Sequence, residues 1–278
     1  MRDILIIARL TWQEAHKRKI FWAALGLGVI FIALYSVGFF FMVRDMREYM
    51  RGRSFALNSG FNFTVMAGFY VISFLGVMLA VLTSVGALSG EISSHTIQVL
   101  AVKPMPRNRI ILGKWLGLAA MLGVYIAFLS EGIALSTRLI SGYMPSHLLE
   151  GILLIILQAV IMLSIALLGG TRLSTVANGV IAFMLYGLAF IGGWLEQIGS
   201  ATSNQTMVDL GIISSLIVPS EAMWKMAAHR MQHPLITSLG ISPFSVGAPP
   251  SRAMLGYALL YVGIMLGLAI WSFNRRDL

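Results

Sequence analysis

The 278-residue chain contains no cysteine, and charged residues make up only 11% of it. The absence of cysteine excludes disulfide bonds, thiolate catalysis and cysteine-ligated zinc or iron–sulfur sites. The charged share is far below the roughly 25% of soluble domains. The phosphate-binding motifs GxxxxGK[ST] and GxGxxG are also absent from the sequence. The chain therefore lacks the two common loops that bind ATP or a dinucleotide.

Hydrophobic residues, in contrast, make up 58% of the chain, and the mean hydropathy is +0.83. Apolar runs recur along the sequence at about the 20 residues that a helix needs to cross a bilayer. The sequence therefore predicts an all-α membrane protein, with residues 1–278 forming a single transmembrane domain. We expect six transmembrane helices, at residues 20–43, 65–89, 115–137, 151–170, 176–198 and 254–273.

Residues 1–19 precede the first span and have an amphipathic pattern. Ile4, Ile7, Thr11 and Ala15 recur at helical spacing, and most of the charged residues fall on the opposite face. This pattern predicts a helix that lies in the plane of the membrane surface. The alternative is a charged lead-in to the first span.

The segments between the later spans differ in length. Residues 44–64 are expected to form a polar loop, whereas only TRLST, residues 171–175, joins the fourth and fifth spans. So short a connection predicts a tight helical hairpin. Residues 199–253 predict two short helices over the outer mouth of the bundle, and Ser220 is the expected N-cap of the second.

Lysine and arginine set the expected orientation, because they gather on the cytoplasmic side of membrane proteins. With the amino terminus inside, the inner segments hold 12 of these bases in 54 residues and the outer segments hold 8 in 89. Both termini are therefore predicted to be cytoplasmic. Four arginines in residues 44–64 oppose this count, and we attribute them to snorkelling or to pairing with Asp45 and Glu48. The net charge of +9 is thus explained by topology and anionic lipid, without a nucleic-acid partner.

Residues 90–114, here called the coupling segment, form a polar interlude between the second and third spans. Glu91 would favour the positive end of a short helix, and Pro104 would stop that helix. Arg107 and Lys114 would bind lipid phosphates. A short stiff helix between two spans can transmit a displacement from a soluble partner, whereas the alternative is a loop whose bases only set topology. The segment fits E-x4-T-x3-L-x3-P-x2-R-x5-G-K at Glu91, Thr96, Leu100, Pro104, Arg107, Gly113 and Lys114.

This pattern resembles the loop between the second and third spans of ABC-2 type transporter permeases, where it forms a coupling helix seated on the ATPase. The overall order is also similar to that of these type V exporters: an amphipathic lead-in, six spans, and an outer re-entrant or helical segment before the last. The stretch SSLIVPSEAMWKMAAHRM, residues 214–231, is most similar to the permeases of multicopper-enzyme maturation. His95 departs from the pattern, because many relatives have glycine there.

The resemblance implies a permease subunit that is not itself catalytic. ATP and magnesium would bind to separate cytoplasmic ABC ATPase subunits, and a second copy of the chain would complete a homodimer. The location implied is the cytoplasmic (inner) membrane of a prokaryote, with an extracytoplasmic accessory protein as a further candidate partner. One alternative function is an ATP-independent anchor or scaffold for an outer partner. Another is a proton-coupled carrier. The residues implied in coupling to the ATPase are Glu91, Thr96, Leu100, Pro104, Arg107 and Lys114.

The sequence offers two further candidate sites, one at an acid within a span and one at a pair of histidines. Glu131 lies in the outer part of the third span, where an acid is costly and commonly functional, unless it pairs with Arg138 or reaches the interface. His229 and His233 are weak candidates for a soft metal such as Cu(I), and otherwise are surface histidines. Gln158 and Asn178 are expected to pack or hydrogen-bond between helices.

Overall fold

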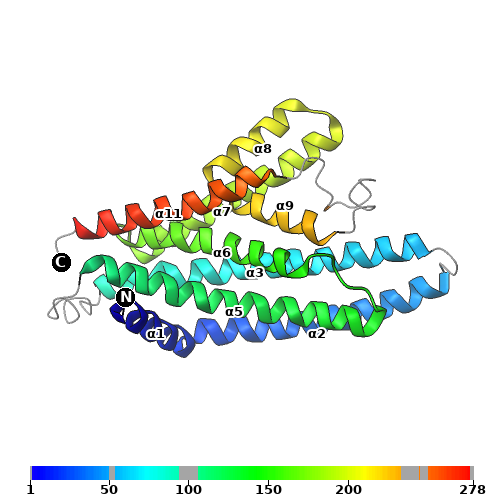
Figure 1. Cartoon of the computed structure of the whole chain (residues 1–278), viewed down its shortest axis with the longest axis horizontal. Coiled ribbons are helices and arrows are strands. Elements are labelled where there is room, and N and C mark those ends of the chain that lie inside the picture. The colour runs from blue at the N-terminus through cyan, green and yellow to red at the C-terminus, as the bar shows by residue number, and fades with distance from the viewer. Residues whose placement is uncertain (1, 50–53, 94–105, 233–243, 245–249, 276–278) are drawn as a thin grey trace.

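The computed structural model describes residues 2–49, 54–93, 106–232, 244 and 250–275. Within these residues, helices are the only regular secondary structure. Six of them are long and apolar enough to cross a membrane, which confirms the predicted all-α class and the six spans. The helices in order are α1 (Arg2–Lys17), α2 (Lys19–Tyr49), α3 (Ser54–Ser93), α5 (Arg107–Ser141), α6 (Leu148–Gly170), α7 (Thr175–Thr202), α8 (Gln205–Ile217), α9 (Ser220–Met231) and α11 (Arg252–Asn274) (Figure 1).

The helices extend beyond the apolar runs that predicted them. The expected polar loop at 44–64 is wrong in this respect, because α2 continues to Tyr49 and α3 begins at Ser54. Arginine, methionine and glutamate are good helix formers, so a change from apolar to polar residues does not end a helix. α5 begins at Arg107 because Pro106, with φ −61° and ψ 128°, has an extended backbone and no amide proton to donate.

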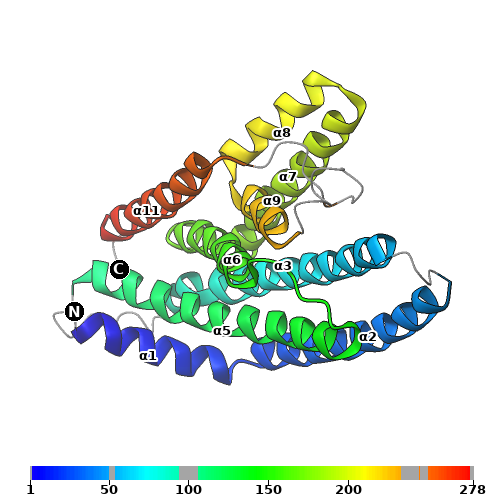
Figure 2. The ribbon, with the colours of Figure 1, turned by 45° about the vertical axis from the view of Figure 1, so that its right-hand side comes forward.

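The start of α1 and the end of α11 lie at one end of the bundle, where α3 ends, α5 begins and the α6–α7 hairpin turns (Figure 1). We call this the terminal end. The end of α2, the start of α3 and the α5–α6 connection lie at the opposite end (Figures 1 and 2). An even number of spans brings the start of α1 and the end of α11 to the same side.

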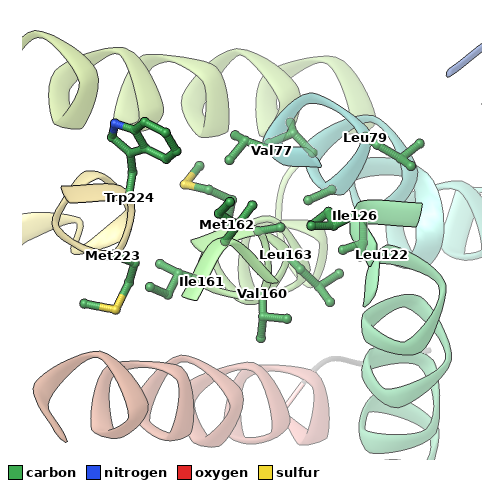
Figure 3. Close-up of a cluster of buried hydrophobic side chains, with 14 of the residues drawn as sticks. Val77, Leu79, Leu122, Ile126, Val160, Ile161, Met162, Leu163, Met223 and Trp224 are labelled. Atoms are coloured by element: carbon green, nitrogen blue, oxygen red, sulfur yellow. The ribbon is translucent and has the colours of Figure 1, made fainter. Parts of the chain in front are cut away.

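The core of the bundle is built around α6. Val160, Ile161, Met162 and Leu163 are all buried, although they are consecutive and point in four directions. Figure 3 shows these four side chains with residues of α3, α5 and α9 around them, and α11 beside them. By contrast, α2 and α11 bury little of their apolar length. Their exposed apolar faces are those expected to contact lipid.

The α6–α7 hairpin forms as predicted. Ser174 caps α7 by accepting a hydrogen bond from the Ala177 amide. Asn178 Nδ2 donates to the Ala166 carbonyl oxygen at 2.8 Å, so this side chain joins the two helices. Gln158 is also buried, but its amide has no hydrogen-bond partner among the described residues.

The two predicted helices after α7 are present, but the second lies elsewhere than expected. α8 packs along α7, and α9 then bends away from α8 by 109°. α9 is buried against α6, with further contacts to α7 and α3, so it lies inside the bundle and not over its mouth (Figure 2). Pro219 is the N-cap of α9, and Ser220 is its first helical residue, which corrects the predicted cap.

Candidate functional site

The first turns of α5 follow the coupling segment and contact three other helices at the terminal end. Arg109 pairs with Asp3 of α1. Lys114 Nζ donates to the Ala87 carbonyl oxygen of α3 at 2.9 Å. Arg107 Nη1 lies 3.4 Å from the carbonyl oxygens of Phe273 and Asn274, which end α11. These contacts connect the start of α5 to the start of α1 and to the last turns of α3 and α11.

Two glycines bring α1 into backbone contact with α5. A methyl group on Gly113 would be 2.5 Å from Ile7 Cβ, and one on Gly117 would be 2.5 Å from the Ala8 carbonyl oxygen. Glycines four residues apart form one face of a helix and allow close approach of a second helix. The buried face of α1 is the predicted one, with Ile7, Thr11 and Ala15 buried. The position of α1 at the membrane surface stays a prediction.

The α6–α7 hairpin joins the same end of the bundle through Ser272 of α11. Thr171 and Ser272 share a hydrogen bond of 2.8 Å between their hydroxyl groups. Arg172 Nε donates to the same hydroxyl oxygen at 3.1 Å. Since α11 also contacts Arg107, a continuous set of polar contacts runs from α5 through α11 to the hairpin.

The structure corrects two expectations about the coupling segment. Glu91 lies in the last turn of α3, so its backbone is at the negative end of a helix and not at the start of a new one. Lys114 is only 4% exposed and bonds to the protein, so it is not available to lipid phosphates. Thr96, Leu100 and Pro104 lie outside the described residues, as does the side chain of Glu91. The coupling role of these residues stays a prediction.

A second group of charged residues, missed in the sequence, lies toward the opposite end. Lys225 Nζ of α9 is 2.6 Å from Glu196 Oε2 of α7, and the side chain of Lys225 is 6% exposed. Glu221 is 3% exposed, and its Oε2 has no hydrogen-bond partner among the described residues. We call these three residues the charge cluster. Charges buried in a membrane protein are expensive and commonly functional.

A cavity of about 20 Å³ adjoins the charge cluster on one side. Its lining includes Glu221 and Lys225 and the aromatic rings of Tyr70, Trp224 and Phe244. These rings are packed together, with the Tyr70 and Trp224 centroids 5.0 Å apart. A space of this size holds about one water molecule.

The other predicted site residues are less well placed. Glu131 is exposed on α5, and within the described residues it forms no ion pair with Arg138, which corrects that pairing. The acid with a buried carboxyl group is therefore Glu221 and not Glu131. His229 is partly buried, and its Nδ1 has no partner in the described part of the chain. His233 lies outside the described residues, and in the rest no three possible His, Cys, Asp or Glu ligands come together.

The sequence signal of the charge cluster is weak. Glu221 and Lys225 are four residues apart, which is an ordinary pattern of a solvated helix. Glu196 is 29 residues from Lys225, and nothing in the spacing joins them. Only the burial of α9 reveals that these charges share one site.

Comparison with known proteins agrees with the architecture. No curated protein matches the chain. A family model described as "ABC-2 family transporter protein" matches residues 5–278, which is nearly the whole chain. The match includes all six candidate spans, the start of α5 and the charge cluster. The chain therefore belongs to the ABC-2 family of transporter proteins.

Proposed function

We propose that this chain is the membrane subunit of an ATP-driven transporter whose ATPase subunits are separate chains. Family membership supports a permease role, and the absence of a GxxxxGK[ST] motif agrees with ATP binding elsewhere. The ATPase would dock at the coupling segment on the cytoplasmic side. The observation that carries this proposal is the junction at the start of α5, where residues 107–117 contact α1, α3 and α11.

Through this junction, a displacement of the coupling segment would move α1, α3 and α11. The close packing at Gly113 and Gly117 leaves little room for α1 to slide against α5, so the two helices would move together. The contacts of Arg107 and Lys114 would carry the same movement to α11 and α3. A flexible connection would absorb the movement instead.

The far end of α5 and the connection after it contact α3 and α9, so a movement of α5 would reach these two helices. α5 has 35 residues and is therefore roughly 52 Å long, at about 1.5 Å per residue. In the connection that follows it, the Tyr143 hydroxyl accepts a hydrogen bond from Asn62 Nδ2 at 2.8 Å. The Ser146 amide donates to the Met231 carbonyl oxygen at the end of α9. Movement of α5 would thus reach the buried helix that carries Glu221 and Lys225.

The expected assembly contains two copies of this chain and two ATPases in a prokaryotic cytoplasmic membrane, with both termini inside. This stoichiometry rests on the resemblance to ABC-2 permeases. The work done would be export of a substrate or force on a partner at the outer face. The likeness of residues 214–231 to permeases of multicopper-enzyme maturation supports an outer accessory protein as that partner.

The test is purification of the tagged chain from its native membranes in a mild detergent. We expect an ABC ATPase to copurify, and the complex to hydrolyse ATP. A variant with Glu91→Ala and Gln98→Pro should lose the ATPase, because both changes fall in the coupling segment. Glu150→Gln is the matched control, since Glu150 is an exposed acid at the opposite end, near His147 and Arg230.

Two results would count against the proposal. If the double variant is expressed normally and keeps full ATP-driven activity, then the coupling segment does not transmit the work. If no ATPase copurifies with the wild-type chain, then the function as an ATP-independent anchor or scaffold is favoured.

A further inference from the structure

A larger cavity, of about 300 Å³, lies on the other side of Lys225. It is bounded by α7, α8, α9 and the start of α11. Its polar lining includes Glu196, Lys225 and Ser215, and its apolar lining includes Ile212, Leu216 and Met254. We call this space the α8 cavity. It combines charged groups at one wall with apolar side chains at another, as expected of a site for an amphiphilic molecule.

The α8 cavity is lined by one ion pair, Glu196 with Lys225, and a second acid, Glu221, lines the smaller cavity next to it. Glu196 and Glu221 are two acids, and Lys225 is the only base in the charge cluster. Lys225 is bonded to Glu196, whereas Oε2 of the buried Glu221 has no hydrogen-bond partner among the described residues. Burial raises the pKa of Glu221 to about 8, so this carboxyl group is mostly protonated at pH 7 while Lys225 stays on Glu196. A buried carboxylate is stable only when a positive charge is close. The cluster therefore takes one more cation when Lys225 moves to Glu221 and Glu221 releases its proton.

The mouth of the α8 cavity lies on an apolar surface. Ile212 and Leu216 line the cavity, and their side chains are 46% and 51% exposed. The neighbouring α8 residues Leu210, Ile213 and Ile217 are also exposed and apolar. In a membrane protein such a helix face contacts lipid, so a molecule dissolved in the bilayer would reach the cavity from the side.

We propose that the α8 cavity binds an amphiphilic organic cation, such as a hydrophobic amine or a quaternary ammonium compound. Its ammonium group pairs with the carboxylate of Glu196, and its apolar part lies against Ile212, Leu216 and Met254. This assignment is independent of ATP coupling, because it rests on the cavity and the charge count alone.

Glu221 provides a second partner for Lys225 when the bound cation takes its first partner, Glu196. Lys225 lies between the two cavities and belongs to the lining of both. Glu221 is four residues earlier on the same helix, which is the spacing at which an acid and a base on α9 are neighbours. When the ligand pairs with Glu196, the Lys225 ammonium turns to Glu221, which releases its proton to solvent, and each acid then has one cation. No charge is left buried without a partner.

The test is saturable binding of radiolabelled dodecyltrimethylammonium to the purified chain in a neutral maltoside detergent, measured by scintillation proximity. We expect other hydrophobic amines to compete. Dodecyl sulfate and dodecylphosphocholine should not compete at the same concentration, because an anionic or zwitterionic head places negative charge near Glu196. Glu196→Gln should weaken binding at least tenfold, and Glu150→Gln should leave it unchanged.

A second variant protects the test against misfolding. Leu216→Trp keeps every charge and enlarges an exposed side chain at the mouth of the cavity, so the fold should tolerate it. It should also weaken binding at least tenfold. The proposal is overturned if dodecylphosphocholine or dodecyl sulfate competes equally well, or if a folded Glu196→Gln protein binds like the wild type. If Glu196→Gln does not fold, unchanged binding by Leu216→Trp overturns it.

Discussion

Gly117 of α5 lies so close to Ala8 of α1 that a methyl group on the glycine would be 2.5 Å from the alanine carbonyl oxygen. The two helices are thus in backbone contact at this point. α1 is therefore an integral part of the terminal end of the bundle, and its amphipathic face is covered by protein and not only by lipid.

This contact predicts that Gly117→Ala destabilises the protein. The added methyl group must push α1 away, and overpacking of this kind costs about 1–3 kcal/mol. Gly123→Ala on the same helix is the control, because its methyl group would meet only Ile156 Cδ1, at 4.0 Å. The free energy of unfolding, measured by denaturant titration in mixed micelles, should fall for the first variant only. Equal values for both would show that α1 is not held by this contact.

The pair of Lys225 and Glu196 predicts strong coupling between two substitutions. Lys225→Met alone leaves the Glu196 carboxylate without its partner, which costs about 3–5 kcal/mol, and Glu196→Gln should cost less because Lys225 can turn to Glu221. The double variant removes both charges and should be more stable than Lys225→Met alone. A double-mutant cycle on the unfolding free energy measures this. Additive effects would mean that the two charges do not interact in the folded protein.

Asn178 predicts a smaller effect at the α6–α7 hairpin. Asn178→Ala removes the hydrogen bond to the Ala166 carbonyl oxygen, and bonds of this kind between membrane helices are worth about 0.6–1.7 kcal/mol. Asn108→Ala, the same change at an exposed position of α5, should alter stability by less than about 0.5 kcal/mol. The comparison uses the same titration, and a larger loss at Asn108 would contradict it.

The absence of native cysteine allows a direct test of orientation. His95→Cys introduces a unique thiol into the coupling segment, and Thr206→Cys introduces one at an exposed position in the first turn of α8. In intact cells, a membrane-impermeant maleimide should label the second variant and not the first. After the membrane is opened, both should react. Labelling of His95→Cys in intact cells would place the coupling segment outside and overturn the proposed function.

Much of the architecture was predictable from local features. The six spans follow from the length of the apolar runs, because a buried backbone in lipid must satisfy its own hydrogen bonds as a helix. The hairpin at 171–175 follows from a connection too short to leave the membrane region. The face of α1 that carries Ile7, Thr11 and Ala15 follows from helical periodicity. Helix ends were predicted less well, since α2 and α3 continue through the polar residues beyond their apolar runs.

The sequence by itself determined the class of the protein and the number of spans, because each depends on residues that are neighbours in the chain. Only the tertiary structure decided that α9 is buried, that Lys225 meets Glu196 and that Gly113 and Gly117 hold α1. These features depend on which helices pack together. The free energy of a buried charge or of a close backbone contact comes from partners that are distant in sequence, and the spacing of residues along one helix does not record them.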